Sequence, residues 1–431
     1  MNPTRLHVDE VFSPDTLSLG FAIRDHMNSI EEAPGKVWFW ELADAVIDAG
    51  RCVQCGVCVA ACPSDSIGIS KAGLPMLVKM CTGCSLCWDF CPRGGLRYES
   101  TWSPTREPKE PEVPSSTAVS IGRKARPGVE EYQGDENLGG SLGLVQRAYA
   151  ARVQTKISGS QDGGVVSQIL VTLLESGEID GALLARQSPT EPFKAEPFLA
   201  RTPQEVLESA GSYYNQTMAL GHLDLAKYQV STKSRIAMVG TPCEIQGIRA
   251  LQSRPWSRGR SLIDTIELTS ALLCTKSFDY ERLILGELRD SRGIEPDQIG
   301  KIDVIHGKLF VDSKSGDNLL EEPIKNFHGA ALKGCDECAD FLGRAADISV
   351  GSVGSVAGWS SVLVRTHEGM RAFQSTWPRL QIRDLDNKQA LEKLDALDMK
   401  IALAALEREL QTRRYLRPFG VRRRAPLRPV R

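Results

Sequence analysis

A cysteine motif that occurs twice between residues 52 and 91 limits the fold of this chain more than any other feature. The first copy is Cys52-x2-Cys55-x2-Cys58-x3-Cys62-Pro63, and the second is Cys81-x2-Cys84-x2-Cys87-x3-Cys91-Pro92. The chain has 12 cysteines in 431 residues, and the other four are Cys243, Cys274, Cys335 and Cys338. Because the N-terminus carries early charges and no apolar stretch, we expect no secretory signal. In a reducing cytosol, clustered thiols hold metal more often than they form disulfides.

The spacing within each copy is that of bacterial two-cluster ferredoxins. Three closely spaced thiolates reach three corners of one 4Fe–4S cubane, and the fourth cysteine of each copy ligates the other cluster. Zinc binding and inert thiols are the alternatives, and two complete copies with both prolines disfavour them. Such a module conducts single electrons between a donor and an acceptor that lie elsewhere. We therefore predict one cluster bound by Cys52, Cys55, Cys58 and Cys91, and a second bound by Cys81, Cys84, Cys87 and Cys62.

The composition is that of an ordinary globular protein, with 42% hydrophobic and 25% charged residues. The length allows roughly two to three domains of about 150 residues each. The apolar fraction excludes disorder as the main state, and the net charge of −2 gives no global basic field for nucleic acid. No run of about 18 apolar residues is present to span a bilayer. We therefore expect a cytoplasmic protein without a nucleic-acid partner.

Changes in composition divide the chain into five segments. Residues 1–45 form an N-terminal extension, whose last part has near-helical apolar spacing and is expected to pack on the next domain or to bind a partner. Residues 46–100 hold the cysteine module, and residues 101–135, with five prolines, are expected to be a linker. Residues 136–400 form the main domain. Residues 401–431 comprise a helix end and an arginine-rich tail, interpreted as a solvated tail or clamp, or as a contact for an acidic subunit or anionic cofactor.

The main domain alternates strand-like and helix-like segments, which indicates a mixed α/β fold. Helices are predicted at 164–174, 244–251 and 388–413. Strands are predicted at 180–185, 235–240, 264–274, 346–355 and 359–366. The predicted fold class is therefore α/β (α+β), with a bacterial-type two-cluster ferredoxin domain followed by a mixed α/β domain.

The four cysteines outside the doubled motif are individually weaker signals. Cys243 lies between a predicted strand and helix, where a helix N-terminus stabilises a thiolate and would suit a nucleophile. Cys274 ends an apolar strand, and Cys335-x2-Cys338 is a metal-type pair. Together these residues supply the four ligands that a cubane needs. From the residues alone, a third 4Fe–4S cluster, a zinc site and the absence of a shared site all stay open.

A glycine-rich loop at 158–167, SGSQDGGVVS, leads directly into a predicted helix. Backbone amides at a helix start suit a phosphate or pyrophosphate group. The loop has neither the three spaced glycines of the dinucleotide fingerprint nor a P-loop pattern. An ordinary loop and helix cap is the alternative interpretation.

Several segments of the main domain carry a family resemblance. They are SGSQDGGVVSQILVTLLESGEIDGALL, IAMVGTPCEIQGIRAL, LLCTKSFDYERL, CDECADFLGRAADISVGSVGS and GWSSVLVRTHEG, in that order. Over residues 140–370 the chain resembles the coenzyme F420 hydrogenase/dehydrogenase beta-subunit family, and the fused cysteine module resembles the electron-input subunits of F420H2 dehydrogenases. One departure follows Gly211-Ser212, where relatives carry Lys-Tyr and this chain carries Tyr213-Tyr214. That departure puts the details of nucleotide binding in question.

The resemblance implies bound FAD, a third 4Fe–4S cluster on Cys243, Cys274, Cys335 and Cys338, and hydride exchange with coenzyme F420 as substrate. It makes the glycine-rich loop a contact for FAD. Lys308, in a strand-turn-strand segment, is a candidate for the anionic tail of F420, with an exposed turn lysine as the alternative. The residues taken to bind the cofactors are Ser160, Gln161, Asp162, Gly163, Gly164, Ser167, Thr241 and Lys308.

The implied chemistry requires a flavin, because F420H2 gives up two electrons at once and each cluster accepts one. No catalytic side chain is needed, so His222, His306 and His328 are expected to be structural or surface residues. The predicted protein is an F420-dependent oxidoreductase whose partners are other redox subunits, either in the cytoplasm or peripheral on a membrane complex. The alternatives are a reductase on the same scaffold with another substrate, and a non-catalytic electron-transfer or assembly subunit.

Overall fold

The computed structural model describes residues 37–95, 142–143, 145–223, 230–252 and 262–412. Most of the N-terminal extension, the proline-rich segment at 101–135 and the arginine-rich tail lie outside these residues. The predictions made for those segments therefore stay predictions.

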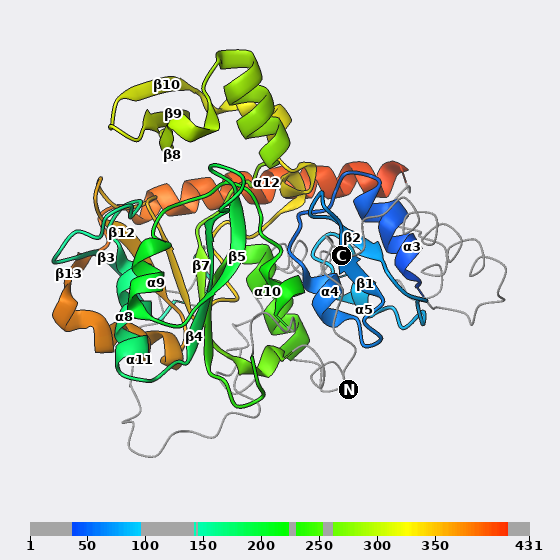
Figure 1. Ribbon diagram of the computed structural model, residues 1–431, viewed down its shortest axis with the longest axis horizontal. Coiled ribbons are helices and arrows are strands. Elements are labelled where there is room, and N and C mark those ends of the chain that lie inside the picture. The colour runs from blue at the N-terminus through cyan, green and yellow to red at the C-terminus, as the bar shows by residue number, and fades with distance from the viewer. Residues whose placement is uncertain (1–36, 96–141, 144, 224–229, 253–261, 413–431) are drawn as a thin grey trace.

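A mixed eight-stranded sheet forms the centre of the main domain, in the order β13-β3-β12-β11-β7-β6-β4-β5 (Figure 1). The strands are β3 (Arg147–Val153), β4 (Gly181–Gln187), β5 (Ala195–Ala200), β6 (Ile236–Gly240), β7 (Ile266–Leu272), β11 (Ile348–Gly351), β12 (Ser360–Val364) and β13 (Leu380–Asp384). Neighbours among β11, β7, β6 and β4 run parallel, and the other neighbours pair antiparallel. Since β3 pairs antiparallel with β12 and β12 with β11, the strands β3, β6 and β7 all end at one edge. The loops that follow them meet there.

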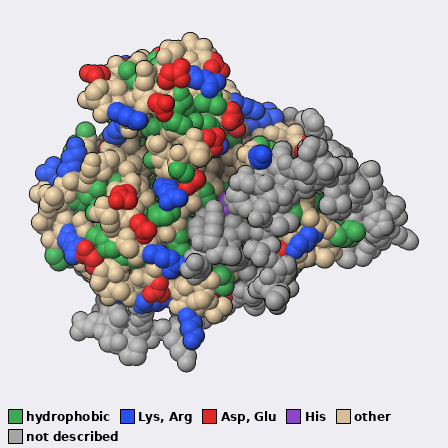
Figure 2. All heavy atoms as spheres, in the orientation of Figure 1, with side chains coloured by type: hydrophobic (Ala, Val, Ile, Leu, Met, Phe, Trp, Pro, Cys, Tyr) green, Lys and Arg blue, Asp and Glu red, His purple; other side chains and the backbone are tan. Residues whose placement is uncertain are grey.

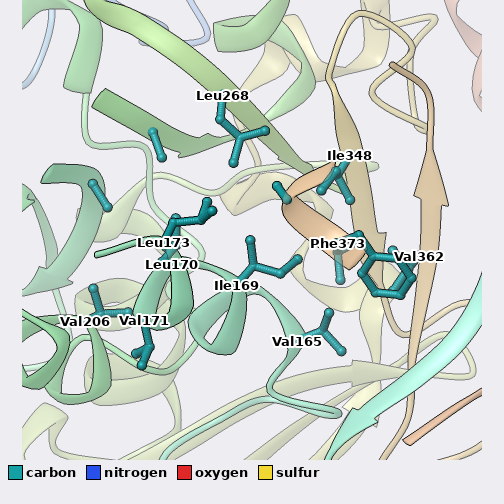
Figure 3. Close-up of a cluster of buried hydrophobic side chains, with 14 of the residues drawn as sticks. Val165, Ile169, Leu170, Val171, Leu173, Val206, Leu268, Ile348, Val362 and Phe373 are labelled. Atoms are coloured by element: carbon teal, nitrogen blue, oxygen red, sulfur yellow. The ribbon is translucent and has the colours of Figure 1, made fainter. Parts of the chain in front are cut away.

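Helices cover both faces of this sheet. They are α8 (Val165–Glu175), α9 (Pro203–Glu208), α10 (Pro242–Gln252) and α11 (His367–Thr376), while α12 (Lys388–Thr412) passes the edge just described (Figure 1). Side chains alternate along β4: Ala182 and Leu184 join the cluster of α8, α9 and α11, whereas Leu183 packs with α10. Figure 3 shows the cluster of α8, α9 and α11, in which Phe373 lies beside Val362 of β12 and near Ile348 of β11. No described helix is both long and apolar enough to cross a membrane.

The predicted helices and strands of the main domain are present with shifted ends. The helix predicted from Gly164 begins one residue later, because Gly164 has a left-handed φ of 68° and acts as the N-cap of α8. The strand predicted at 264–274 is shorter in the structure, since β7 covers Ile266–Leu272 and Cys274 lies in the loop that follows. Mixed helix and strand content and the large mixed sheet confirm the predicted fold class.

The cysteine module repeats its backbone as well as its sequence. Its elements are α3 (Phe39–Leu42), the π-helix η1 (Ala43–Ile47), α4 (Val57–Ala61), β1 (Ile67–Ile69), β2 (Pro75–Leu77) and α5 (Leu86–Asp89). Gln54 and Gly56 in the first copy, and Gly83 and Ser85 in the second, all adopt left-handed φ angles between 54° and 76°. Each copy therefore turns sharply between its first and third cysteines, and a short helix begins one residue before the third cysteine.

The segment at 37–47 packs on the cysteine module, as predicted. Trp38, Phe39 and Leu42 are buried in one cluster with Cys58 and Cys87. The rings of Trp38 and Trp40 stack at 5.1 Å between centroids. A helix of four residues has little stability of its own, so burial of these large apolar side chains holds the segment in place.

The cysteine module and the main domain share one hydrophobic core. Val53 and Leu86 of the module belong to the same cluster as Leu220, Ile245 and Ile248 of the main domain. Helices α4 and α10 touch where Gly247 meets Val57. The module is therefore embedded in the main domain rather than tethered to it.

A small three-stranded sheet, in the order β10-β9-β8, lies above the carboxyl edge of the large sheet (Figure 1). Its strands β8 (Ile299–Ile305), β9 (Lys308–Ser313) and β10 (Asn318–Pro323) share an apolar cluster with the π-helix η7 (Glu281–Asp290) and with η9 (Ile324–Ala330). His306 and Gly307 form the expected two-residue turn, with φ angles of 49° and 75°. Figure 2 shows basic and acidic side chains interspersed on its surface. The remaining short helices are η3 (Ala219–His222), η6 (Ile263–Thr265), η8 (Pro296–Gln298), η10 (Lys333–Glu337) and η11 (Trp377–Arg379).

The contact of α4 with α10 gives a test of the shared core. Alanine in place of a helix-interior glycine normally stabilises a helix by about 0.5–1 kcal/mol. A Cβ at Gly247, however, would lie 2.0 Å from Cγ2 of Val57, and overpacking costs about 1–3 kcal/mol. We expect Gly247→Ala to lower the free energy of unfolding in a denaturant titration.

The matched control is Gly329→Ala, because a Cβ at Gly329 would meet nothing within 4 Å. The double variant Gly247→Ala, Val57→Ala should recover part of the stability lost by Gly247→Ala. A single variant as stable as the native protein would show that the two parts do not pack as described.

Candidate metal and cofactor site

Electrostatic coupling groups the cysteines of the module into two sets. Burial raises the pKa of Cys52 to about 12, and the charge of Cys91 adds to the rise. Burial raises the pKa of Cys58 well above its ordinary value, and the charges of Cys52 and Cys91 raise it further. The pKa of Cys55 is raised first by burial, then by the charge of Cys243 in the main domain, and after it by the charges of Cys91 and Cys58. We call Cys52, Cys55, Cys58 and Cys91 the first thiol set.

The second thiol set consists of Cys62, Cys81, Cys84 and Cys87. Burial raises the pKa of Cys87, and the charges of Cys58, Cys81, Cys62 and Cys84 raise it further. The pKa of Cys81 is raised first by burial and also by Cys62 and Cys84. Cys62 and Cys91 thus each lie with the cysteines of the other copy, which is the arrangement that crossed ligation requires.

The third thiol set, Cys243, Cys274, Cys335 and Cys338, gathers at the carboxyl edge of the large sheet. Cys243 follows β6, Cys274 follows β7, and the other two lie in and beside η10. The pKa of Cys274 is raised well above its ordinary value by burial, then by the charges of Cys335, Cys243 and Cys338. Burial also raises the pKa of Cys243. A raised pKa is unfavourable for a free thiolate nucleophile, so this arrangement favours a shared ligand set.

The three thiol sets form one row. Apart from burial, the largest charge effect on Cys55 comes from Cys243, which puts the first set beside the third. The largest charge effect on Cys87 comes from Cys58, which puts the first set beside the second. Cys84, at the far end of the row, is exposed. The first set therefore lies between the other two.

Backbone amides point at the sulfur atoms of all three sets. The amides of Gln54, Gly83 and Arg93 donate to the Sγ atoms of Cys52, Cys81 and Cys91, each at 3.4 Å. Ser66 N donates to Cys62 Sγ at 3.2 Å, and Ser277 N donates to Cys335 Sγ at 3.4 Å. Such donors stabilise thiolates and tune iron–sulfur potentials. Soft thiolate donors with these amides fit 4Fe–4S clusters.

All 12 cysteines lie within the described residues, and none forms a disulfide. In this part of the chain no group of three or more His, Cys, Asp or Glu side chains is arranged around a single metal ion.

Gln216 connects the segments that carry the third set. Its Nε2 donates to Ser277 Oγ at 2.8 Å and to Thr241 Oγ1 at 3.2 Å. Thr241 Oγ1 lies 3.1 Å from Cys243 Sγ, so Thr241 belongs to this network and not to the glycine-rich loop. No sequence pattern marks Gln216, because a lone glutamine carries no motif. Its partners Thr241 and Ser277 lie 25 and 61 residues further along the chain, so no local pattern indicates these contacts.

The glycines of the glycine-rich loop are needed for packing. A Cβ on Gly163 would lie 2.4 Å from the carbonyl oxygen of Ala151 and 2.8 Å from the amide of Ser360. Gly163 N donates to Ser360 Oγ at 3.1 Å. The loop is thereby held between β3 and β12 at the carboxyl edge of the sheet. Ser160 Oγ donates to the carbonyl oxygen of Ile157 at 2.8 Å, and Ser167 lies half-buried in the first turn of α8.

A polar cluster joins this loop to the small sheet. Lys301 Nζ donates to the carbonyl oxygen of Gln161 at 3.1 Å and pairs with Asp303 at 2.7 Å. Burial, followed by the charge of Asp303, raises the pKa of Asp162. Burial also raises the pKa of Tyr214, which lies near Asp303, Asp162 and Gln161. Since Tyr214 is two residues before Gln216, one short segment links this polar cluster to the third thiol set.

One atom of this polar cluster has no partner. Gln161 Oε1 is buried and accepts no hydrogen bond from the described residues. Gln161 Nε2, by contrast, donates to the carbonyl oxygen of Ile302 at 3.4 Å. A buried acceptor without a donor is costly, so a bound molecule with a hydroxyl or N–H group fits here.

Lys308 does not reach the polar cluster. It lies at the exposed hairpin turn and pairs with Glu321 at 2.6 Å. Lys301, from the preceding strand, is the lysine that contacts the loop. An open groove of about 850 Å³ adjoins the start of the loop and is lined by residues that include Lys156, Ser158 and Arg379.

The three histidines named above lie outside these groups, as expected for structural or surface residues. His222 is buried in η3, and His306 and His328 are exposed.

Comparison with known proteins identifies the family. A family model for the C terminus of the coenzyme F420 hydrogenase/dehydrogenase beta subunit matches residues 233–388, and its N-terminal counterpart matches residues 148–224. The chain is 34% identical over 230 residues to the beta subunit of coenzyme F420 hydrogenase from Methanococcus voltae, covering 53% of this chain and 80% of that protein. The chain belongs to the coenzyme F420 hydrogenase/dehydrogenase beta-subunit family.

The cysteine module also has a match. A 4Fe-4S dicluster domain model covers residues 45–97. A subunit of the F420H2 dehydrogenase of Methanosarcina mazei is 28% identical over 367 residues, covering 82% of this chain and 89% of that protein. The predicted family and the predicted ferredoxin-like module are both confirmed.

A solved structure has a similar fold. A chain of the F420-reducing NiFe hydrogenase complex from Methanosarcina barkeri superposes with a TM-score of 0.59 at 26% identity, covering 63% of this chain and 94% of that one. Together the comparisons make this chain an F420-related iron–sulfur oxidoreductase or electron-transfer subunit.

Proposed function

We propose that this chain exchanges a hydride between coenzyme F420 and bound FAD and passes single electrons through three 4Fe–4S clusters to or from a partner subunit. The observation that carries the proposal is the buried row of three thiol sets, which begins beside the polar cluster under the small sheet. The comparisons support it, since relatives are named as F420 hydrogenase and F420H2 dehydrogenase subunits.

The residues at the carboxyl edge fit a flavin. When bound, FAD supplies the exchange between a hydride and single electrons. Gln161 offers a free buried acceptor, and Lys301 offers a cation near the same loop for an anionic group. Lys301 replaces Lys308 in our assignment, because Lys301 contacts the glycine-rich loop at the carbonyl oxygen of Gln161, whereas Lys308 lies at the exposed hairpin turn. Each of the two lysines also pairs with one carboxylate. The chain's part is to bind and orient, and no side chain is assigned as a nucleophile.

The row of thiols orders the path within the chain. The third set lies nearest the polar cluster, the first set is central, and the second set reaches the surface at Cys84. We therefore assign the partner subunit to the surface around Cys84. The names of the relatives indicate that such partners are other redox subunits of a complex.

The direct experiment is to mix the anaerobically purified protein with F420H2 and record its spectrum. We expect the flavin and cluster absorbance to bleach. If F420H2 leaves both unchanged in an FAD-loaded protein, another substrate serves this scaffold. Substoichiometric FAD after gentle purification would indicate a non-catalytic electron-transfer subunit.

The proposed third cluster can be tested by the iron content of the protein. Three clusters require about twelve iron atoms per chain, four for each 4Fe–4S cluster. Replacing Cys335 by Ser removes one ligand of the third set and should remove about a third of the iron, while the signals of the other two clusters persist. Iron and sulfide analysis under anaerobic conditions measures this. A fully loaded native protein with only about eight irons would rule out the third cluster.

The flavin prediction uses Gln161. A variant at Gly164 is a poor test, because its φ of 68° and the nearby Val153 methyl groups at 3.3 Å make any side chain disturb the start of α8. Gln161→Leu removes the free acceptor together with Nε2, whose hydrogen bond to the carbonyl oxygen of Ile302 is long at 3.4 Å. Loss of one hydrogen bond to the cofactor, worth about 1–1.5 kcal/mol, should weaken FAD binding roughly tenfold. Titration of the flavin-depleted protein with FAD measures this.

Iron content should be unchanged in Gln161→Leu, and Gln298→Leu, at an exposed glutamine of η8, should bind FAD normally. Undiminished FAD affinity in Gln161→Leu would remove this residue from the binding site.

The order of the row predicts the effect of Cys84. Cys84→Ala should spare the reduction of FAD by F420H2 and block electron delivery to the redox subunit recovered with the chain by native purification. An artificial dye that takes electrons from the flavin should still be reduced. Stopped-flow absorbance follows both steps.

Thr82→Ala is the control, because Thr82 is an exposed neighbour that is not a ligand. If Cys84→Ala abolishes rapid flavin reduction in a folded, FAD-loaded protein, the second set lies on the substrate side and the order is reversed.

A further inference from the structure

Two buried arginines lie at the junction between the first and third thiol sets. Arg51 immediately precedes the first cysteine, and Arg93 follows Cys91 by two residues. Their side chains are only 2% and 4% exposed. Buried cations require compensating negative charge, so the partners of each arginine decide what it does.

Arg51 is compensated by a carboxylate. Its Nε and Nη2 donate to the two carboxylate oxygens of Glu337, each at 2.6 Å, and Glu337 lies between Cys335 and Cys338. Arg51 Nη1 donates to the carbonyl oxygen of Ala45 at 2.8 Å. This bidentate pair is neutral as a unit and fixes the geometry between the cysteine module and η10.

Arg93 has no carboxylate of its own among the described residues. Its Nε donates to the carbonyl oxygen of Gly334 at 2.5 Å and its Nη1 donates to that of Pro92 at 2.7 Å. Burial alone would lower the pKa of Arg93, but negative charges, led by those of Cys338, Glu337 and Cys243, hold it above its ordinary value. Because Glu337 is already paired, Arg51, Arg93 and Glu337 together carry one excess positive charge.

That excess charge lies between two thiol sets. The backbone amide of Arg93 donates to Cys91 Sγ of the first set at 3.4 Å. Its side chain donates to the carbonyl oxygens of Pro92, the residue after Cys91, and of Gly334, the residue before Cys335 of the third set. None of these contacts is to a cysteine of the second set or to a residue next to one.

We propose that Arg93 is a shared counter-ion for the first and third thiol sets and raises the reduction potentials of the clusters that they bind. A cluster gains negative charge on reduction, so a nearby buried cation stabilises the reduced form. One cation between two neighbouring clusters acts on both potentials together. This role rests on the proposed function, since it requires the third cluster.

The test is the reduction potential of each cluster in the fully loaded protein, followed by electron paramagnetic resonance during a redox titration. Arg93→Gln removes the charge and keeps a donor for Gly334. We expect two of the three cluster potentials to fall and that of the second thiol set to stay unchanged. Arg93→Lys keeps the charge and should restore both. Equal shifts in all three clusters, or none, would overturn the proposal.

Glu337→Gln should shift the cluster potentials in the direction opposite to Arg93→Gln. It removes one negative charge from the same group, so the same two potentials should rise. This variant also decides the matter if Arg93→Gln fails to retain its clusters, since unmoved potentials in Glu337→Gln would contradict the proposal.

Arg365→Gln is the matched control. Arg365 is buried and donates to the carbonyl oxygens of Leu142 and Leu342, and Asp340, Arg344 and Asp395 are its charged neighbours. Its loss should leave all three potentials unchanged. About eight irons in the native protein would defeat the proposed function itself, whereas about twelve irons with unmoved potentials would defeat only the role of Arg93.

Discussion

Burial of many thiols in one region is the constraint on which the rest of this structure depends. Cys55, Cys58 and Cys87 lie in the interior, and burial raises their pKa well above its ordinary value. An ionised thiol there is costly unless a metal ion, an amide donor or a buried cation compensates its charge. The amides aimed at sulfur, the charge of Arg93 and the iron that the motif is expected to bind all meet this one demand.

The same constraint explains why the cysteine module is embedded in the main domain. Val53 and Leu86 share a core with Ile245 and Ile248 of α10. Electron transfer between clusters needs short, constant separations, which a module on a flexible linker would not maintain. A shared core keeps the first and third thiol sets side by side. The two hydrogen bonds from Arg51 to Glu337 fix the position of η10 relative to the cysteine module.

The large sheet supplies the other half of the site. Strands β3, β6 and β7 end at one edge, so the glycine-rich loop, Cys243 and Cys274 meet there although they are far apart in the chain. The small sheet adds Lys301 and Asp303 from above. The segment from Tyr214 to Gln216 then joins the polar cluster to the third thiol set. A cofactor placed between these groups would contact both the polar cluster and the third thiol set.

The sequence by itself determined the local features. Cysteine spacing predicted the two-cluster ferredoxin module, and apolar periodicity predicted α8, α10 and α12, because both depend on residues close in the chain. Only the tertiary structure decided the row order, the preference for Lys301 over Lys308, and the charges at the junction. Arg51 and Glu337 are 286 residues apart, and Arg93 and Gly334 are 241 apart. Their contacts follow from how the module packs on the sheet, and no local pattern encodes such packing.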